Sequence, residues 1–344
     1  MKLIYHEVGD GSRPADSEAV LSDNELDEID KLIASGLSFH DSGDVEPARD
    51  CYLKALELDP RNSQALDLAG LLCMQCGESD AAKEFYKSAI EVDPDNPRFL
   101  LHLGILLLDQ DDLGGSEEIL NQVIELDPDN ADARFYLALG MRATDRREDA
   151  KEKLETACSL DRENGSYHKW LGLIFMETGD LVTALEFTKT SLELDHEDVT
   201  AYVQLGAILN ALQDLELAEK ALRSGLEIDS EDIRCRAELS GVLIELGRLV
   251  EAKKELEFII ESNGKEHPSA LSNLAFLESI NGNKKLAAEL VERAMEMDVK
   301  SIDVLLTAHK VFTNLNDKEK TDYILENIQK IAPDDARVLN LLFA

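Results

Sequence analysis

The sequence is poor in aromatic residues, glycine and proline. Aromatic side chains make up 5% of the 344 residues, with a single tryptophan, and there are only 19 glycines and 8 prolines. Hydrophobic residues make up 44% of the chain, which is ample for a buried core. This composition predicts a folded, soluble chain that favours helices.

Basic residues are scarce relative to acidic ones. There are 35 lysines and arginines against 71 aspartates and glutamates, which gives a formal net charge of −36. Because such a chain repels phosphate groups, nucleic acid and anionic membranes are not expected partners. The acidity indicates a solvated outer surface, with attraction of a basic partner or a salty habitat as alternatives.

Long apolar runs and a cysteine framework are also missing. No apolar run is long enough to span a bilayer, and the first ten residues lack the apolar core of a signal peptide. We therefore expect a cytoplasmic protein without membrane insertion. The cysteines are odd in number and lie in apolar-periodic segments, which predicts reduced core thiols rather than disulfides. They are Cys51, Cys73, Cys76, Cys158 and Cys235.

Three Asp-Pro steps reveal an internal repeat. Pro60, Pro94 and Pro128 follow one another at intervals of 34 residues, and each ends a helical pattern. The same period carries forward with one extra residue near His267, and a closing proline recurs at Pro333. It predicts nine repeats between an N-terminal extension (1–28) and a C-terminal apolar partial helix (336–344). The repeats cover 29–62, 63–96, 97–130, 131–164, 165–198, 199–232, 233–267, 268–301 and 302–335.

Two columns of small residues indicate how each repeat folds. Position 8 of the frame holds residues such as Gly36, and position 20 holds residues such as Ala48. Two antiparallel helices can cross closely only where neither carries a bulky side chain, so each repeat is predicted to be a helical hairpin. Glycine marks the turn inside five hairpins because it accepts a positive φ. These glycines are Gly43, Gly77, Gly179, Gly247 and Gly282.

This pattern resembles the tetratricopeptide repeat family over about nine-tenths of the chain. The resemblance implies an all-α fold, a right-handed superhelical α-solenoid of about nine tandem helix-turn-helix hairpins. It also implies that the first helix of each hairpin lines a concave groove, where partner proteins lie against positions 2, 5, 9, 12 and 13. The closing proline is missing from the fourth to eighth repeats, so we expect these joints to be looser or differently angled.

Groove positions read along the sequence form an apolar stripe with balanced charge. We predict that this stripe binds a protein or peptide segment of a partner. It fades after Val203, where Ala237, Gly241, Ser272 and Lys310 follow. The predicted partner-binding residues are Leu71, Leu101, Ile105, Phe135, Tyr136, Leu139, Arg142, Lys169, Trp170, Leu173, Met176 and Val203.

Aromatic residues gather in the fourth and fifth repeats. Phe135, Tyr136 and Trp170 occupy position 5 or 6 of neighbouring first helices, so they are expected to lie close together. Arg142 and Lys169 flank them. Because binding energy concentrates in aromatic and arginine anchors, these five residues form our hot-spot hypothesis. The alternative is that the rings only pack between adjacent repeats.

No catalytic, metal-binding or cofactor-binding pattern stands out. Cys73 and Cys76 have the spacing of a metal or redox pair, but they lie within a predicted helix without a second pair, so structural thiols are favoured. The sequence predicts a non-catalytic protein–protein interaction scaffold or adaptor. The alternative is a regulatory or substrate-delivery subunit of an enzyme complex. The apolar segment 336–344 is expected to dock on the ninth repeat or to mediate self-association.

Overall fold

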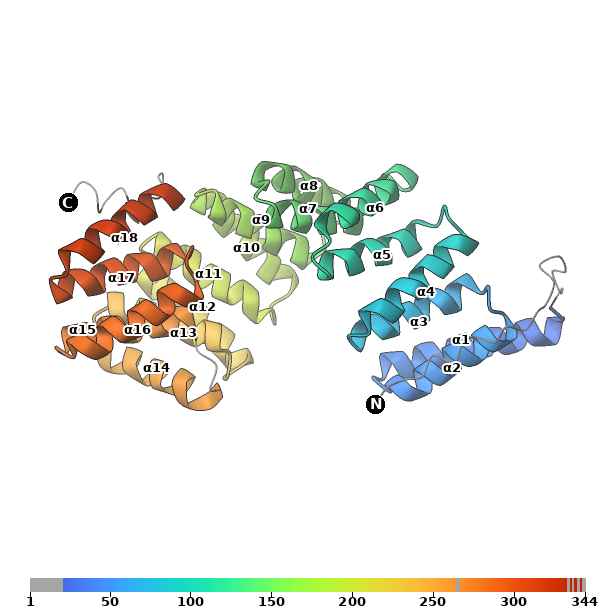
Figure 1. Ribbon diagram of the computed structural model, residues 1–344, viewed down its shortest axis with the longest axis horizontal. Coiled ribbons are helices and arrows are strands. Elements are labelled where there is room, and N and C mark those ends of the chain that lie inside the picture. Colours follow the sequence, from blue (N-terminus) through green and yellow to red (C-terminus); the bar gives the residue numbers. More distant parts are fainter. Residues whose placement is uncertain (1–20, 264–266, 333–334, 336, 339–340, 342–344) are drawn as a thin grey trace. The chain divides into compact units, whose positions relative to one another are not determined.

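The computed structural model describes residues 21–263, 267–332, 335, 337–338 and 341. These residues form eighteen α-helices and no β-strand (Figure 1), which confirms the predicted all-α helical repeat fold. The chain divides into two compact units, the first ending at Pro128 and the second beginning at Asp129. None of the described helices is both long enough and apolar enough to cross a membrane.

The first unit contains three helical hairpins. The two helices of each hairpin pack together, and each second helix also packs against the next first helix. The helices are α1 (Asp23–Asp41), α2 (Val45–Leu58), α3 (Ser63–Gln75), α4 (Ser79–Val92), α5 (Pro97–Asp109) and α6 (Leu113–Leu126).

The second unit contains six hairpins packed in the same way. In addition, the first helices of its last four hairpins pack directly on one another, α11 on α13, α13 on α15 and α15 on α17. The helices are α7 (Ala131–Ala143), α8 (Arg147–Leu160), α9 (Gly165–Glu177), α10 (Leu181–Leu194), α11 (Val199–Ala211), α12 (Leu215–Ile228), α13 (Ile233–Glu245), α14 (Leu249–Asn263), α15 (Pro268–Ile280), α16 (Lys284–Met297), α17 (Ile302–Leu315) and α18 (Lys318–Ile331).

Side chains of Asn, Asp and Ser start many of the first helices. The Asn62 carboxamide oxygen accepts a hydrogen bond from the Ala65 N–H at 2.9 Å, which satisfies one of the free donors at the start of α3. Helix α1 begins before its repeat frame because Ser22 and Glu25 form a capping box, each accepting from the backbone N–H of the other.

Every hairpin turns at frame position 15 through a residue with positive φ. The five glycines predicted from the sequence have φ between 73° and 86°. In the other four hairpins Asp111, Asp145, Gln213 and Asn316 take φ values from 59° to 65°. A left-handed residue ends the first helix and lets the chain reverse. The turn therefore keeps its place in the frame even where glycine is absent.

The small residues lie at the helix crossings, as the sequence predicts. A Cβ atom added to Gly36 would come within 2.5 Å of the Tyr52 ring, and one added to Gly206 would come within 2.5 Å of Leu222 Cγ. Ala48 is fully buried at the first crossing. The second helix thus lies too close for any larger side chain at position 8 of these repeats.

Not every cysteine is part of a core. Cys73, Cys158 and Cys235 are buried, whereas Cys51 is half-buried and Cys76 is exposed. Cys76 is the C-cap residue of α3, at the end of the helix. The expectation of five core thiols is therefore wrong for Cys76.

The described part of the C-terminal segment packs on the last two hairpins. Val338 is fully buried in the core built from α15 to α18, and Leu341 packs at its edge. The other residues of the predicted partial helix 336–344 lie outside the described residues, except for Arg337, and so do residues 1–20 of the N-terminal extension.

Candidate protein-binding groove

The predicted groove residues occur in both units. Leu71 on α3 and Leu101 and Ile105 on α5 are half-buried within the first unit. The other nine lie on α7, α9 and α11 of the second unit, and all of them except Phe135 are half-buried. They are Phe135, Tyr136, Leu139, Arg142, Lys169, Trp170, Leu173, Met176 and Val203.

The three aromatic residues of the hot-spot hypothesis form one cluster in the second unit. The Phe135 ring centre lies 5.0 Å from that of Tyr136 and 6.4 Å from that of Trp170, which confirms the predicted proximity. Phe135 is only 8% exposed, so it packs between α7 and α9. We call Phe135, Tyr136, Tyr167 and Trp170 the aromatic cluster.

Tyr167 is a member of this cluster that the groove positions did not reveal. Its ring centre lies 5.1 Å from that of Phe135, and its hydroxyl donates a hydrogen bond to Asp132 Oδ1 at 2.6 Å. Burial, followed by this hydrogen bond, raises the pKa of Tyr167 far above its ordinary value. Tyr167 stands at position 3 of its repeat, which sequence reasoning had not assigned to the groove.

The cations beside the aromatic cluster already have partners. The Arg142 guanidinium lies 5.5 Å from the Trp170 ring centre, and its Nη2 is 2.5 Å from Glu177 Oε1. Lys169 Nζ lies 2.5 Å from Asp198 Oδ2. The charges of Arg142 and Lys169 are therefore compensated within the chain, and the rings of Tyr136 and Trp170 beside them are half-buried.

In the first unit a buried carboxylate takes the place of an apolar groove residue. Asp67 on α3 is fully buried, and its two oxygens lie 2.5 Å from His102 Nδ1 and 2.9 Å from Arg98 Nη2 on α5. These contacts connect the first helices of two consecutive hairpins. The sequence signal was an aspartate at groove position 5, but nothing in the pattern identified its partners.

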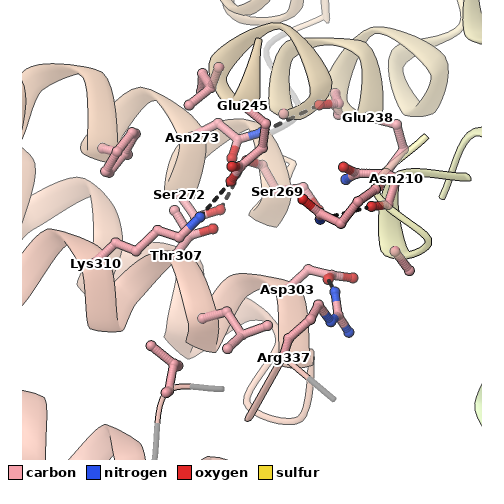
Figure 2. Close-up of a pocket in the computed structure, with 18 residues that line it drawn as sticks. Asn210, Glu238, Glu245, Ser269, Ser272, Asn273, Asp303, Thr307, Lys310 and Arg337 are labelled. Carbon is pink, nitrogen blue, oxygen red and sulfur yellow. Dashed lines mark hydrogen bonds and ion pairs between the residues drawn. The ribbon is translucent and has the colours of Figure 1, made fainter. Parts of the chain in front are cut away.

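A hollow of about 430 Å³ lies further along the second unit, where the apolar stripe fades (Figure 2). Its walls come from α11, α13, α15 and α17, together with Arg337 and Leu341. Most of the lining residues occupy frame positions 2, 5, 9, 12 or 13, the groove positions implied by the family resemblance, while Glu238, Asn273 and Thr307 occupy position 6.

Small side chains create the hollow. Ala237, Gly241, Ser269 and Ser272 line it on α13 and α15, and a Cβ atom added to Gly241 would meet nothing closer than Asn273 Nδ2 at 3.4 Å. These small residues let the first helices approach one another and leave space above their groove faces. The replacement of large apolar residues by small ones at the groove positions was therefore the sequence signal for this cavity. The sequence analysis did not predict the cavity from that signal.

Two ion pairs stand at the walls of the hollow (Figure 2). Lys310 on α17 reaches Glu245 on α13 at 2.5 Å, and so connects the seventh repeat to the ninth. Arg337 Nη1 lies 2.5 Å from Asp303 Oδ1. Glu238 also lines the hollow, and burial, followed by the nearby Asp303 carboxylate, raises its pKa to about 7.

Comparison with known proteins supports the repeat assignment. The family model for the cilia and flagella-associated protein 70 C-terminal domain, a tetratricopeptide domain, matches residues 31–237. No curated protein matches the chain.

Several solved structures resemble this chain, and one of them, PilF, shows the same fold. PilF of Pseudomonas aeruginosa is 20% identical, with a TM-score of 0.56 over 62% of this chain and 97% of that chain. A thermophilic TPR protein of Thermus thermophilus is 19% identical, with a TM-score of 0.47 over 53% of this chain and 98% of its own. YrrB, described as a TPR protein with an unusual peptide-binding site, is 17% identical, with a TM-score of 0.42 over 54% of this chain and 95% of its own.

Proposed function

This chain belongs to the family of the cilia and flagella-associated protein 70 C-terminal domain, and we propose that it is a non-catalytic scaffold that holds a partner polypeptide. Tetratricopeptide arrays are interaction modules in general. The partner segment lies on the groove face of the second unit and enters the hollow between α11, α13, α15 and α17.

The hollow is the observation that carries this proposal. Its volume of about 430 Å³ falls in the range of about 300–1,000 Å³ that is common for ligand pockets. Asn210, Asn273 and Thr307 bring amide and hydroxyl groups to its walls. Such groups pair with the N–H and C=O groups of an extended peptide, which must find partners when they leave water.

The aromatic cluster supplies a second contact in this proposal. Tyr136 and Trp170 are half-buried on α7 and α9, at position 6 of their repeats. Half-buried Tyr and Trp side chains that keep part of the ring accessible are frequent anchors at protein interfaces. We therefore expect Trp170→Ala to weaken partner binding, whereas Val182→Ala, at a 64% exposed residue of α10, leaves it unchanged.

A pair of glycine substitutions tests the proposal. Random peptides displayed on phage are selected against the wild-type chain, and the winners are measured against Gly241→Phe, whose ring fills the hollow. Gly114→Phe is the matched control, because Gly114 on α6 is exposed and a Cβ there meets nothing. Helical content is checked by circular dichroism.

We expect the selected peptides to bind wild type and Gly114→Phe alike and to lose at least about tenfold in affinity for Gly241→Phe, or about 1.4 kcal/mol. Equal binding to wild type and Gly241→Phe would contradict a role for the hollow. Peptides that also lose affinity for Trp170→Ala would extend the site to the aromatic cluster.

A further inference from the structure

The charges that line the hollow do not cancel. Three carboxylates, Glu238, Glu245 and Asp303, face two cations, Lys310 and Arg337. Lys310 pairs with Glu245 and Arg337 with Asp303, each at 2.5 Å. Within the described part of the chain, Glu238 makes neither a hydrogen bond nor an ion pair.

Arg337 has little capacity left to compensate Glu238. Besides Asp303, it binds Asp335 through Nη2 at 2.8 Å and through Nε at 3.1 Å, so two carboxylates already share its charge. Its guanidinium acts on Glu238 only at longer range, as the weakest of the three influences on the pKa of that carboxyl.

The remaining surroundings of Glu238 offer no unpaired positive charge among the described residues. Arg234, one turn earlier on α13, pairs with Asp232 at 2.9 Å. On its own helix the next charged residue of the lining is Glu245, which Lys310 of α17 neutralises. Helix α17 also presents Asp303, a like charge. The lining residues from α11, the turn after it and α15 are uncharged: they are Asn210, Ala211, Gln213, Ser269, Ser272, Asn273 and Phe276. An acid in such a place is costly unless a cation compensates it.

We propose that Glu238 recognises a lysine or arginine side chain of the partner polypeptide, which enters the hollow and pairs with this carboxylate. The inference rests on the proposed function and specifies its partner. It follows from charge complementarity, because the lining has one uncompensated negative charge and every cation in it is taken.

The shape of the hollow suits such a side chain. Leu306 and Phe276 offer apolar wall for the methylene stem of lysine or arginine, while the charged head meets Glu238. A hydrogen bond between two ionised groups is among the stronger polar contacts, and it is strengthened where water is scarce. The net charge of −36 also attracts basic segments over a distance.

Peptide pools with a fixed central residue test this inference. Four synthetic pools carry lysine, arginine, leucine or glutamate at the centre and the same mixture of uncharged residues around it. Their affinities are measured by fluorescence anisotropy with wild type, Glu238→Gln and the control Glu289→Gln, which removes an exposed carboxylate from α16. The binding of each pool is also measured with Gly241→Phe.

We expect the lysine and arginine pools to bind wild type at least about tenfold more tightly than the leucine and glutamate pools. The preference disappears in Glu238→Gln and persists in Glu289→Gln. For wild type, the preference grows as the pH rises through about 7, because Glu238 gains its charge there. Glu238→Gln shows no such rise.

The outcomes separate the inference from the proposed function. If Glu238→Gln keeps the preference, or if the leucine pool binds as tightly as the lysine pool, the inference is wrong, while sensitivity to Gly241→Phe still supports the hollow as a binding site. If every pool binds Gly241→Phe as it binds wild type, the function proposed for the hollow is wrong. If no pool binds wild type, both are wrong.

Discussion

The aromatic cluster and the hollow are built on equivalent positions of the same repeat. Frame position 6 holds Tyr136 on α7 and Trp170 on α9, but Glu238 on α13. Around the aromatic cluster the space is filled by rings, and the nearby cations have acidic partners. Around the hollow the neighbours are small and Glu238 is uncompensated. The repeat therefore fixes the backbone of the groove, while the side chains decide whether a position stabilises the fold or receives a ligand.

This difference has an energetic meaning. Filled positions contribute buried apolar area, whereas an empty space beside an unpaired carboxylate lowers stability in the absence of a partner. Binding sites often lower stability in this way, because the unfilled volume and the unpaired polar groups that a ligand needs are unfavourable in the free protein. Filling the space or removing the unpaired carboxylate at the hollow should consequently raise stability, whereas removing a ring from the aromatic cluster should lower it.

Removing the central ring of the aromatic cluster should have the largest effect. Phe135→Ala is expected to destabilise the second unit by about 3–5 kcal/mol, because it empties a nearly closed site. Phe276→Ala, which removes a half-buried ring at the hollow, should cost clearly less. Urea denaturation followed by the fluorescence of Trp170, the only tryptophan, reports on the cluster directly. A smaller loss for Phe135→Ala than for Phe276→Ala would mean that the cluster is not a core.

Two glycine-to-alanine substitutions should have opposite signs. Gly206→Ala places a Cβ 2.5 Å from Leu222 Cγ, so it should destabilise by about 1–3 kcal/mol. Gly241→Ala meets nothing closer than 3.4 Å and should stabilise α13 by about 0.5–1 kcal/mol, because alanine loses less backbone entropy than glycine. Thermal melting of both variants beside wild type checks the pair. Destabilisation by Gly241→Ala would show that the hollow cannot accommodate a Cβ atom at position 241.

Glu238→Gln should stabilise the protein in a pH-dependent way. Folding raises the pKa of Glu238 from 4.5 to about 7, so the native state favours its protonated form. The stability that this preference provides is complete below about pH 4.5 and is lost as the pH rises through 7. Glutamine avoids that loss, so the variant should gain about 1–2 kcal/mol over wild type at alkaline pH, allowing for the partial exposure of the carboxyl.

The measurement is the difference in unfolding free energy between Glu238→Gln and wild type from acidic to mildly alkaline pH. Taking a difference cancels every other group that titrates in this range. A difference that stays constant with pH would show that Glu238 is well solvated or has a compensating partner, and would weaken the contrast between the two regions.

Much of the fold could be predicted from the sequence, because it rests on local rules. The period of Pro60, Pro94 and Pro128 and the small residues at positions 8 and 20 act within one hairpin. The turns inside the hairpins show a limit of prediction from local sequence. Gln213 has no turn preference of its own, yet it takes the same left-handed conformation as Gly43 because the packed hairpin requires it.

The candidate site was harder to predict, because it depends on residues far apart in the chain. Lys310 and Glu245 are separated by 65 positions and meet only because α13, α15 and α17 stack. A stripe of apolar residues in the sequence predicts contact surface, but it does not predict unfilled space. The cavity arises instead where Ala237, Gly241 and Ser272 leave space, and small residues alone do not reveal whether a neighbouring helix fills that space.

The smallest expected effect concerns the ion pairs of the two regions. Lys169 and Asp198, near the aromatic cluster, have side chains only 19% and 15% exposed, whereas Lys310 and Glu245 at the hollow are 47% and 40% exposed. Lys169→Met should lower the free energy of unfolding by about 1–3 kcal/mol, since the largely buried Asp198 carboxylate loses its cation and keeps only the hydrogen bond from the Ala201 N–H. Lys310→Met should cost no more than about 0.5 kcal/mol, and added salt should remove even that difference, because water screens an exposed pair. Urea titrations at low and high salt measure both variants. Equal costs would mean that the hollow is as rigidly closed as the aromatic cluster, and a partner segment could then enter only after the Lys310–Glu245 contact opens.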